Sequence, residues 1–252
     1  NGGDGFAAAR RLATGQDCTA RPVAVLYLGQ PGVDGTPDPT RMSGECARQY
    51  ALATAAGVPV CTPEALARNR RLVIEFYNKR RREMLAARPN AAHLAIAGLE
   101  ADFDVEVITQ NVDDLHERAG STRVTHLHGE LRKLRSSRDP ALIVPIEGWE
   151  QPLDATAPDG ALLRPHIVFF GEAVPQFDHA ARIAAAADVL IVVGTSLAVY
   201  PAASLVHYVR PGVPIYLVDP GAPDVRTIRN PLTHLRERAA VGMPELAERL
   251  RR

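Results

Sequence analysis

The sequence is poor in cysteine, has no excess of charge and contains no long uninterrupted apolar run. Its three cysteines, Cys18, Cys46 and Cys61, are irregularly spaced and form no CxxC pair, so they support neither a disulfide framework nor a cysteine-bound zinc. The 29 basic residues equal the 29 acidic residues, so the chain has no net positive field that would attract nucleic acid or an anionic membrane. The longest apolar run, residues 183–199, is interrupted by Asp188. We therefore expect no nucleic-acid partner and no membrane span.

The opening residues also lack the features of an export signal. The chain begins with Asn1, and the segment that follows has neither a basic start nor an apolar core. Together with the low cysteine content, this predicts a protein of the reducing cytoplasm. Lysine is rare as well, because Lys79 and Lys133 are the only lysines among the 29 basic residues. We interpret this bias as the signature of a GC-rich, bacterial genome.

The chain does contain enough apolar surface for a large core, since 46% of its 252 residues are apolar and 23% are charged. Thr62 and Pro63 predict the start of a first helix, and further helices are expected from Arg70 and over residues 90–99. Strands that alternate with helices predict a doubly wound parallel sheet of the α/β class, with ligands beyond the carboxyl ends of its strands. The expected strands are residues 22–28, 105–110, 124–129, 166–171, 188–194 and 214–219, and the last helices are residues 177–187, 201–209 and 244–252.

Polar side chains follow the strand at residues 105–110. Gln110, Asn111 and Asp113 supply amide and carboxylate groups that can bind a ribose or a carboxamide. The alternative is that these residues only cap the helix that begins near Asp113. Both interpretations stay open on the sequence.

The strand at residues 124–129 contains two histidines. Side chains alternate along a strand, so His126 and His128 are expected on one side and Leu127 on the other. A metal is disfavoured, because no cysteine and no third ligand stand nearby. His128, next to Gly129 at the edge of the sheet, is a candidate general base, and the alternative is a histidine with a purely structural role.

Two more strands end in small polar groups. Gly194, Thr195 and Ser196 offer close approach, hydroxyls and backbone N–H groups to phosphate or ribose oxygens, although small polar residues follow many strands. Asp219 could accept a hydrogen bond from a ribose hydroxyl, or it could only begin an Asp-Pro-Gly turn. Because such groups follow four strands of one sheet, the sequence predicts a nucleotide cleft.

With these residues in place, the sequence resembles the sirtuins, which are NAD-dependent protein-lysine deacylases. The resemblance runs from about Thr62 to the C-terminus. It implies a single Rossmann-like catalytic domain over residues 1–252, with small-module insertions at 62–90 and 132–164 and an atypical segment at 1–60. The motifs that carry it are TQNVDDLHERAG (109–120), HLHGEL (126–131), RPHIVFFGE (164–172), VVGTSLAVYPAASL (192–205) and IYLVDPG (215–221).

The resemblance implies roles for the residues at the strand ends. The carbonyl oxygen of an acyl-lysine attacks the nicotinamide ribose carbon of NAD, nicotinamide leaves, and His128 then deprotonates a ribose hydroxyl that attacks the imidate. An imidazole suits this step near neutral pH. The resemblance also implies that the ribose and nicotinamide contact Gln110, Asn111 and Asp113, and that the adenosine side contacts Gly194, Thr195 and Ser196. It places Asp219 where many members have asparagine, and Ala239 beside the adenine. An acyl-lysine protein or peptide would bind as an added strand along the edge formed by Phe169, Phe170, Gly171 and Glu172.

Tyr77 and Arg80 fit a Tyr-x-x-Arg pattern found in the desuccinylase branch of the family. Residues i and i+3 share one helix face, and a guanidinium with a phenol can hold the carboxylate of a succinyl or malonyl group. Arg81 and Arg82 follow directly, so the alternative is a basic, solvated helix face.

The sequence departs from the family pattern in two places. Sirtuins usually carry two cysteine pairs that hold a structural zinc, but here the first pair would fall near Ser136 and Asp139, and no cysteine follows through Arg164. We therefore predict a small module without zinc and no metal ligands. The family's Gly-Ala-Gly motif after the first strand is also missing, although Gly29, Gly32, Gly35 and Arg41 stand in that region. This segment is either a diverged phosphate loop or a shifted reading frame upstream of an intact remainder.

The sequence is also compatible with functions other than a deacylase. A catalytically impaired module that binds NAD or ADP-ribose is suggested by the altered N-terminal segment. An ADP-ribosyl transferase or an NAD hydrolase could use the same scaffold, and only product analysis separates these from a deacylase. His128, Asn111 and Asp113 favour the enzyme over the impaired module. A Rossmann oxidoreductase is disfavoured, because no GxGxxG opens a helix.

Overall fold

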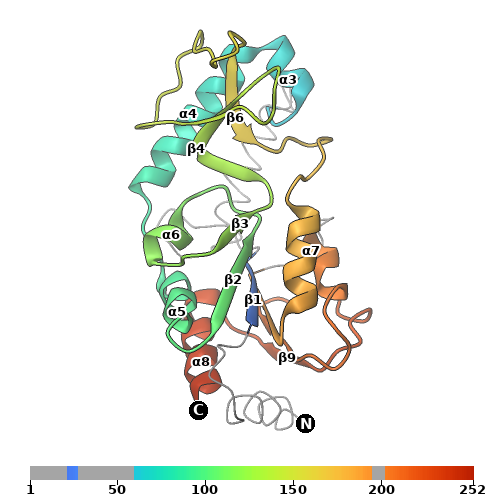
Figure 1. Ribbon diagram of the computed structural model, residues 1–252. Coiled ribbons are helices and arrows are strands. Elements are labelled where there is room, and N and C mark those ends of the chain that lie inside the picture. Colours follow the sequence, from blue (N-terminus) through green and yellow to red (C-terminus); the bar gives the residue numbers. More distant parts are fainter. Residues whose placement is uncertain (1–21, 28–59, 195–201) are drawn as a thin grey trace.

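A parallel sheet forms the centre of the protein. The computed structural model describes residues 22–27, 60–194 and 202–252. Its large sheet has six strands in the order β3-β2-β1-β7-β8-β9, and every neighbouring pair is parallel (Figure 1). This order confirms the predicted doubly wound α/β fold. The strands are β1 (Pro22–Tyr27), β2 (Asp104–Thr109), β3 (Val124–His126), β7 (Val189–Val193), β8 (Ile215–Val218) and β9 (Leu232–Leu235).

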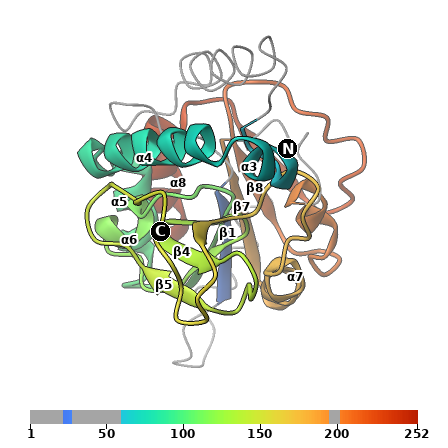
Figure 2. The ribbon, with the colours of Figure 1, turned by 90° about the horizontal axis from the view of Figure 1, so that it is seen from above.

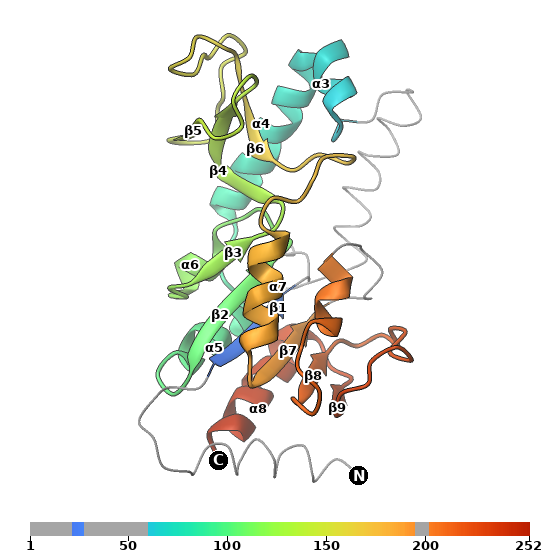
Figure 3. The same cartoon turned by 45° about the vertical axis from the view of Figure 1, so that its right-hand side comes forward.

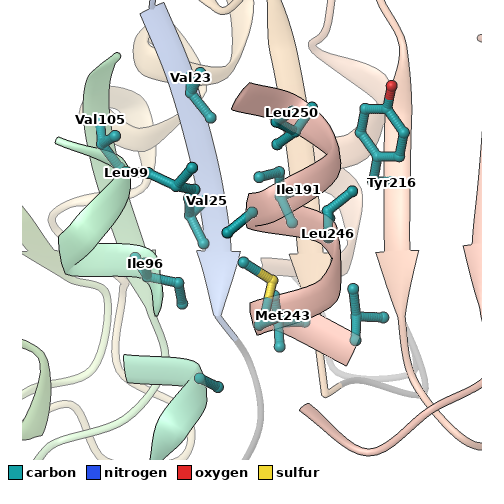
Figure 4. Close-up of a cluster of buried hydrophobic side chains, with 14 of the residues drawn as sticks. Val23, Val25, Ile96, Leu99, Val105, Ile191, Tyr216, Met243, Leu246 and Leu250 are labelled. Atoms are coloured by element: carbon teal, nitrogen blue, oxygen red, sulfur yellow. The ribbon is translucent and has the colours of Figure 1, made fainter. Parts of the chain in front are cut away.

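Alternate residues of these strands enter two different cores. Val23 and Val25 of β1 pack with α5 (Ala91–Leu99) and α8 (Ala239–Arg251) on one face. Ala24 and Leu26 face the other side, where α7 (Phe177–Ala186) and the 3₁₀ helix η1 (Ala202–His207) cover the sheet. Figure 4 shows the first core, in which Met243, Leu246 and Leu250 of α8 reach the strands. Both faces are buried, which explains the nearly continuous apolar strands.

A second, three-stranded antiparallel sheet lies at the other end of the molecule (Figure 3). It consists of β4 (Gly129–Ser136) between β5 (Ile143–Pro145) and β6 (Leu163–Ile167). The helices α3 (Pro63–Arg68) and α4 (Arg70–Ala86) precede it in sequence, and α4 runs along one side of it (Figure 2). α3 begins as predicted, because the Thr62 hydroxyl accepts a hydrogen bond from Ala65 N at 3.1 Å.

Several predicted elements differ in the structure. The segment 166–171 is not a strand of the parallel sheet, because its first residues belong to β6 of the second sheet. The strand predicted at 124–129 ends at His126. β9 was not predicted, because only one of its four residues, Leu235, is buried and the apolar pattern of a core strand is therefore missing. The predicted helix 201–209 is the 3₁₀ helix η1, and α8 begins five residues before Pro244, which lies inside it. Among the described residues, no helix is long and apolar enough to cross a membrane.

The inner face of α8 yields a test of this packing. Leu246 is fully buried in the first core, so Leu246→Ala is expected to lower the free energy of unfolding by about 2–5 kcal/mol. Val241 lies on the same helix but is 56% exposed, so Val241→Ala should change the free energy of unfolding by no more than about 0.5 kcal/mol. Denaturant unfolding measures both values. Equal losses in the two variants would contradict this orientation of α8.

Candidate active site

The predicted polar residues gather at one edge of the parallel sheet. Gln110 and Asn111 follow β2, His128 follows β3 by two residues, Gly194 follows β7, and Asp219 follows β8. These strands are parallel and, with β1 between β2 and β7, lie side by side, so their carboxyl ends share that edge. The predicted residues Thr195 and Ser196, and the loop residues Gly29, Gly32, Gly35 and Arg41, lie outside the described residues.

The loop between β2 and α6 (Leu115–Ala119) holds two buried amides. The side-chain nitrogens of Gln110 and Asn111 are buried, and neither has a hydrogen-bond partner among the described residues. Asn111 is held through its backbone N, which donates to Thr109 Oγ1 at 3.0 Å. An unpaired buried donor is costly unless something accepts from it. Two such donors at the end of a strand fit a ligand that carries hydroxyl or carbonyl oxygens.

Asp113 lies in the same loop and has a structural contact. Its Oδ1 accepts a hydrogen bond at 3.1 Å from the backbone N of Leu115, the first residue of α6, although the N-cap of that helix is Asp114. Asp113 is 7% exposed, and burial raises the pKa of its carboxyl group to about 6. At pH 7 a group with this pKa is still mostly the carboxylate, which accepts hydrogen bonds.

The two histidines of the HLHG segment have different environments. The His126 ring contacts the Asn111 carbonyl oxygen through Nδ1 at 3.0 Å and Glu117 Oε1 through Nε2 at 2.8 Å. Burial lowers the pKa of His126, but the bond to Glu117 outweighs it and the net pKa is raised. Both ring nitrogens are therefore engaged, and His126 has a structural role. Glu117 was missed in the sequence, because no local pattern links residue 117 with residue 126.

His128 lies in the turn that follows β3. Its ring is hydrogen-bonded to the Gln110 backbone, and its carbonyl oxygen accepts from Val168 N at 2.9 Å. Burial lowers the pKa of His128 below its usual value, and the bond to Gln110 only partly opposes this shift. The imidazole is therefore neutral near pH 7, with one nitrogen bonded to a carbonyl and the other able to accept a proton.

The FFGE segment combines a buried Phe169, an exposed Phe170 and a half-buried Glu172. Phe169 is 2% exposed, whereas Phe170 is 67% exposed. Gly171 has a φ of 88°, which bends the chain there. The Glu172 carboxylate accepts from Phe169 N at 2.7 Å, from Arg164 at 2.6 Å and from Arg135 at 3.0 Å. Burial raises the pKa of Glu172, but the bonds from Arg164 and Phe169 outweigh it and the net pKa is lowered. Glu172 thus connects the backbone of this segment to Arg164 and Arg135.

Tyr77 and Arg80 lie one turn apart on α4. Tyr77 is 5% exposed, and its ring stacks on Phe169 with a centroid separation of 5.7 Å and an angle of 20°. Its hydroxyl is hydrogen-bonded to the Cys61 thiol, and burial together with this neighbour raises the pKa of Tyr77 well above its usual value. The phenol is therefore a neutral donor. Arg80 lies close enough for its charge to act on that phenol.

The neighbouring arginines have other partners. Arg81 is fully buried and donates from Nη1 to Trp149 O at 2.7 Å. Arg82 lies 3.8 Å above the Trp149 ring. The alternative of a solvated basic face is therefore wrong for Arg81. Arg80, by contrast, makes a 3.6 Å ion pair with Glu83, a contact between two partly exposed groups that contributes little.

The positions expected to replace the first cysteine pair form a hydrogen-bonded turn. Ser136 Oγ donates to Asp159 Oδ2 at 2.7 Å and accepts from the backbone N of Asp139 at 3.2 Å. A hydroxyl and a carboxylate do not form the sulfur and nitrogen donor set of a structural zinc. Among the described residues, no three His, Cys, Asp or Glu side chains are grouped to hold a metal ion. The zinc-free module stays a prediction.

The last two predicted cofactor residues lie near the end of β8. Asp219 Oδ1 accepts from Gly221 N at 2.7 Å, so its carboxylate does form the predicted turn. Ala239 is the first residue of α8 and is 2% exposed, with its side chain in the first core. Gly194, directly after β7, has a left-handed backbone conformation with a φ of 65°.

Comparison with known proteins identifies the family. The model of the Sir2 family matches residues 50–201. The chain belongs to the Sir2 family. An NAD-dependent protein deacylase from Aggregatibacter actinomycetemcomitans is 54% identical over 174 residues, which cover 69% of this chain and 82% of that protein. A mutant Sir2 homologue solved with ADP-ribose matches 91% of both chains, with a TM-score of 0.74 and 34% identity. A Sir2 homologue solved with NAD has a TM-score of 0.70 and 33% identity over 91% of this chain and 89% of that one.

A buried pair of histidines supports the site loop of this Sir2 protein and makes its stability depend on pH. His116 of α6 packs against His93 of α5 with a ring separation of 4.7 Å, and burial lowers the pKa of His93 from 6.5 to about 4. The unfolded chain therefore binds a proton between pH 6.5 and 4 that the native histidine does not, so this residue's stabilising contribution is complete above pH 6.5 and decreases on acidification.

We expect His93→Gln to remove the part of this dependence that comes from His93. Glutamine does not titrate and is tolerated at this position of the helix cap, where Asn90 and His93 form a capping box. Between neutral pH and pH 5, the stability of wild type should fall relative to the variant by about 2 kcal/mol. Urea unfolding at both pH values measures the difference. A difference that does not change with pH would contradict the assignment of a neutral, buried His93.

Proposed function

We propose that this protein removes acyl groups from lysine side chains of proteins or peptides, with NAD as co-substrate and with nicotinamide and an O-acyl-ADP-ribose as products. The observation that carries the proposal is the neutral His128 at the same sheet edge as the side-chain nitrogens of Gln110 and Asn111, which have no hydrogen-bond partner within residues 22–27, 60–194 and 202–252. The relatives named as NAD-dependent protein deacylases support it. We further propose that the enzyme acts in the cytoplasm.

The residues of the sheet edge fit NAD. The buried NH₂ groups of Gln110 and Asn111 can donate to ribose and carboxamide oxygens, and Asp113 can accept from a hydroxyl. Gly194 adopts a left-handed conformation, and with no side chain it permits close approach on the adenosine side. Asp219 and Ala239 are proposed to border the adenosine. Bound NAD would supply the bond between ribose and nicotinamide that breaks when the acyl oxygen attacks the ribose carbon, with nicotinamide as the leaving group.

His128 acts as the proton acceptor in this proposal. Its ring is fixed by the bond to the Gln110 backbone, so the remaining nitrogen has a defined direction. Because burial keeps the ring neutral, it can take the proton of a ribose hydroxyl at physiological pH without first losing one. Asp113 and the amides position the hydroxyl but do not accept its proton.

The acyl group is proposed to lie against α4. Tyr77 offers a neutral hydroxyl whose present partner, a thiol, is a weak acceptor, so a carboxylate would take that hydrogen bond in preference. Arg80 has a loose ion pair that a carboxylate can replace. We therefore propose a preference for succinyl or malonyl groups over acetyl.

The peptide is proposed to lie along residues 169–172, where Phe170 presents an exposed ring. The insertions at 62–90 and 132–164 are proposed to form one small module that carries this edge. The apolar cluster that joins Tyr77 and Met84 of α4 to Leu131 and Ile167 of the second sheet supports this. Residues 1–252 would then form one catalytic domain.

His128→Ala is expected to reduce turnover by about 10²–10⁴-fold while the fold is kept, because the general base is lost. Mass spectrometry of an acyl-lysine peptide, with and without NAD, measures free lysine and O-acyl-ADP-ribose and so separates deacylation from ADP-ribosyl transfer and NAD hydrolysis. His207→Ala, at an exposed histidine, is the matched control. In wild type, the fall of kcat/KM on acidification should have its midpoint below pH 6.5, because burial lowers the pKa of His128 from that value. Full activity of His128→Ala would exclude the assignment.

Arg80→Met is expected to raise KM for a succinyl-lysine peptide by about tenfold relative to the matched acetyl-lysine peptide, since a charge-assisted hydrogen bond is lost. Arg71→Met is the control, because Arg71 lies on the same helix and makes a similar 3.6 Å ion pair with Glu75. Glu83→Gln should lower the succinyl KM, because it removes the carboxylate that competes for Arg80. Equal effects on both peptides would show that Arg80 does not contact the acyl group.

A further inference from the structure

A continuous stack of side chains connects the peptide edge with Tyr77. The Arg164 guanidinium lies 3.9 Å from the centre of the Phe169 ring. The Phe169 ring stacks on Tyr77 at 5.7 Å. Guanidinium and aromatic planes attract each other, so each layer fixes the tilt of the next. Arg164 has no part in the function proposed so far, although it is the first layer of this stack.

The position of Arg164 is fixed by hydrogen bonds. Nη1 donates to Glu172 Oε1 at 2.6 Å, and Nη2 donates to Glu172 Oε2 and to Ile167 O, each at 3.2 Å. The side chain is 9% exposed. A bidentate pair in such a buried position holds the guanidinium plane in one orientation. The ring of Phe169 therefore rests on a rigid base.

The other end of the stack is fixed as well. The Tyr77 hydroxyl is bonded to the thiol of Cys61, and the carbonyl oxygen of Cys61 accepts from Phe170 N at 2.9 Å. The exposed Phe170 of the proposed peptide edge is thus linked to Tyr77 through Cys61. The charge of Arg80 also acts on the phenol, whereas the guanidinium of Arg164 is paired with Glu172, so Arg80 is the cation that an incoming carboxylate would meet.

We propose that Arg164 is a positioning residue that sets the orientation of the Tyr77 hydroxyl and thereby the selectivity for acyl groups with a terminal carboxylate. This inference rests on the proposed deacylase function. Arg164 acts through Phe169 and does not contact the acyl group. A hydrogen bond to a carboxylate depends steeply on distance and angle, so a small rotation of Tyr77 weakens succinyl binding and leaves acetyl binding much less affected.

Kinetics with two peptides test the proposal. Arg164→Met and Arg164→Lys are measured alone and combined with Tyr77→Phe, with succinyl-lysine and acetyl-lysine peptides of one sequence. Arg164→Met should raise the ratio of succinyl KM to acetyl KM by about tenfold. Arg164→Lys keeps the charge but loses the planar stack, so its effect should be intermediate. In the Tyr77→Phe background the same changes should leave the ratio unaltered, because the hydroxyl is gone.

Arg135→Met is the matched control, because Arg135 also bonds Glu172 at 3.0 Å but has no place in the stack. A purely structural role of Arg164 would lower both activities and the melting temperature without changing the ratio. That result, or the same ratio change in Arg135→Met, would overturn the proposal. So would a ratio change that persists in the Tyr77→Phe background.

A second measurement does not depend on activity. The rate of alkylation of Cys61 by iodoacetamide, followed by mass spectrometry of the peptide that contains it, reports the contact with Tyr77. Arg164→Met should accelerate labelling severalfold, whereas Arg135→Met should not. Unchanged labelling would contradict the mechanical link. If wild type shows no succinyl preference but labelling responds as expected, the acyl assignment fails and the link from Arg164 to Tyr77 stands.

Discussion

The turn at His128 and Gly129 is the constraint on which both sheets and the candidate site depend. β3 ends at His126 and β4 begins at Gly129, so the chain passes from the parallel to the antiparallel sheet across two residues. Gly129 has a φ of 81°, and a Cβ there would overlap the carbonyl group of His166. Only glycine lets β4 and β6 approach this closely at the start of the second sheet. The same turn fixes His128, whose carbonyl oxygen accepts a hydrogen bond from Val168 N, so the proposed base and the proposed peptide edge are anchored together.

Burial decides the chemistry of the residues around this turn. His126 and His128 are two positions apart, yet the pKa of His126 is raised by Glu117 and that of His128 is lowered by burial. One is tied into the structure by both ring nitrogens, and the other is left neutral with a nitrogen available. A similar division holds on α4, where Arg81 is buried among backbone acceptors and Arg80 has a loose ion pair. In both pairs, two residues of the same type lie close together in the sequence but differ in burial and hydrogen-bond partners, and this difference separates their roles.

Local patterns predicted much of the fold. The start of α3 was predicted from Thr62 and Pro63, because a helix cap involves residues a few positions apart. β1 was predicted because its residues are apolar on both faces. The site residues that follow β2, β7 and β8 could also be named in advance, since parallel strands bring their carboxyl ends to one edge. The antiparallel pairing of β6 could not be predicted from local patterns, because it joins β6 to β4, about thirty residues earlier in the chain.

The sequence by itself thus determined the alternation of strands and helices, the family resemblance, and the polar groups at the strand ends, because these depend on periodicity and on short motifs. Only the tertiary structure decided which of these groups are available. Asp113 and Asp219 have an oxygen engaged in local turns, while the amides of Gln110 and Asn111 have no partner among the described residues. Hydrogen bonds and burial join residues far apart in the chain, and the pKa of a side chain follows from those contacts rather than from its neighbours in sequence.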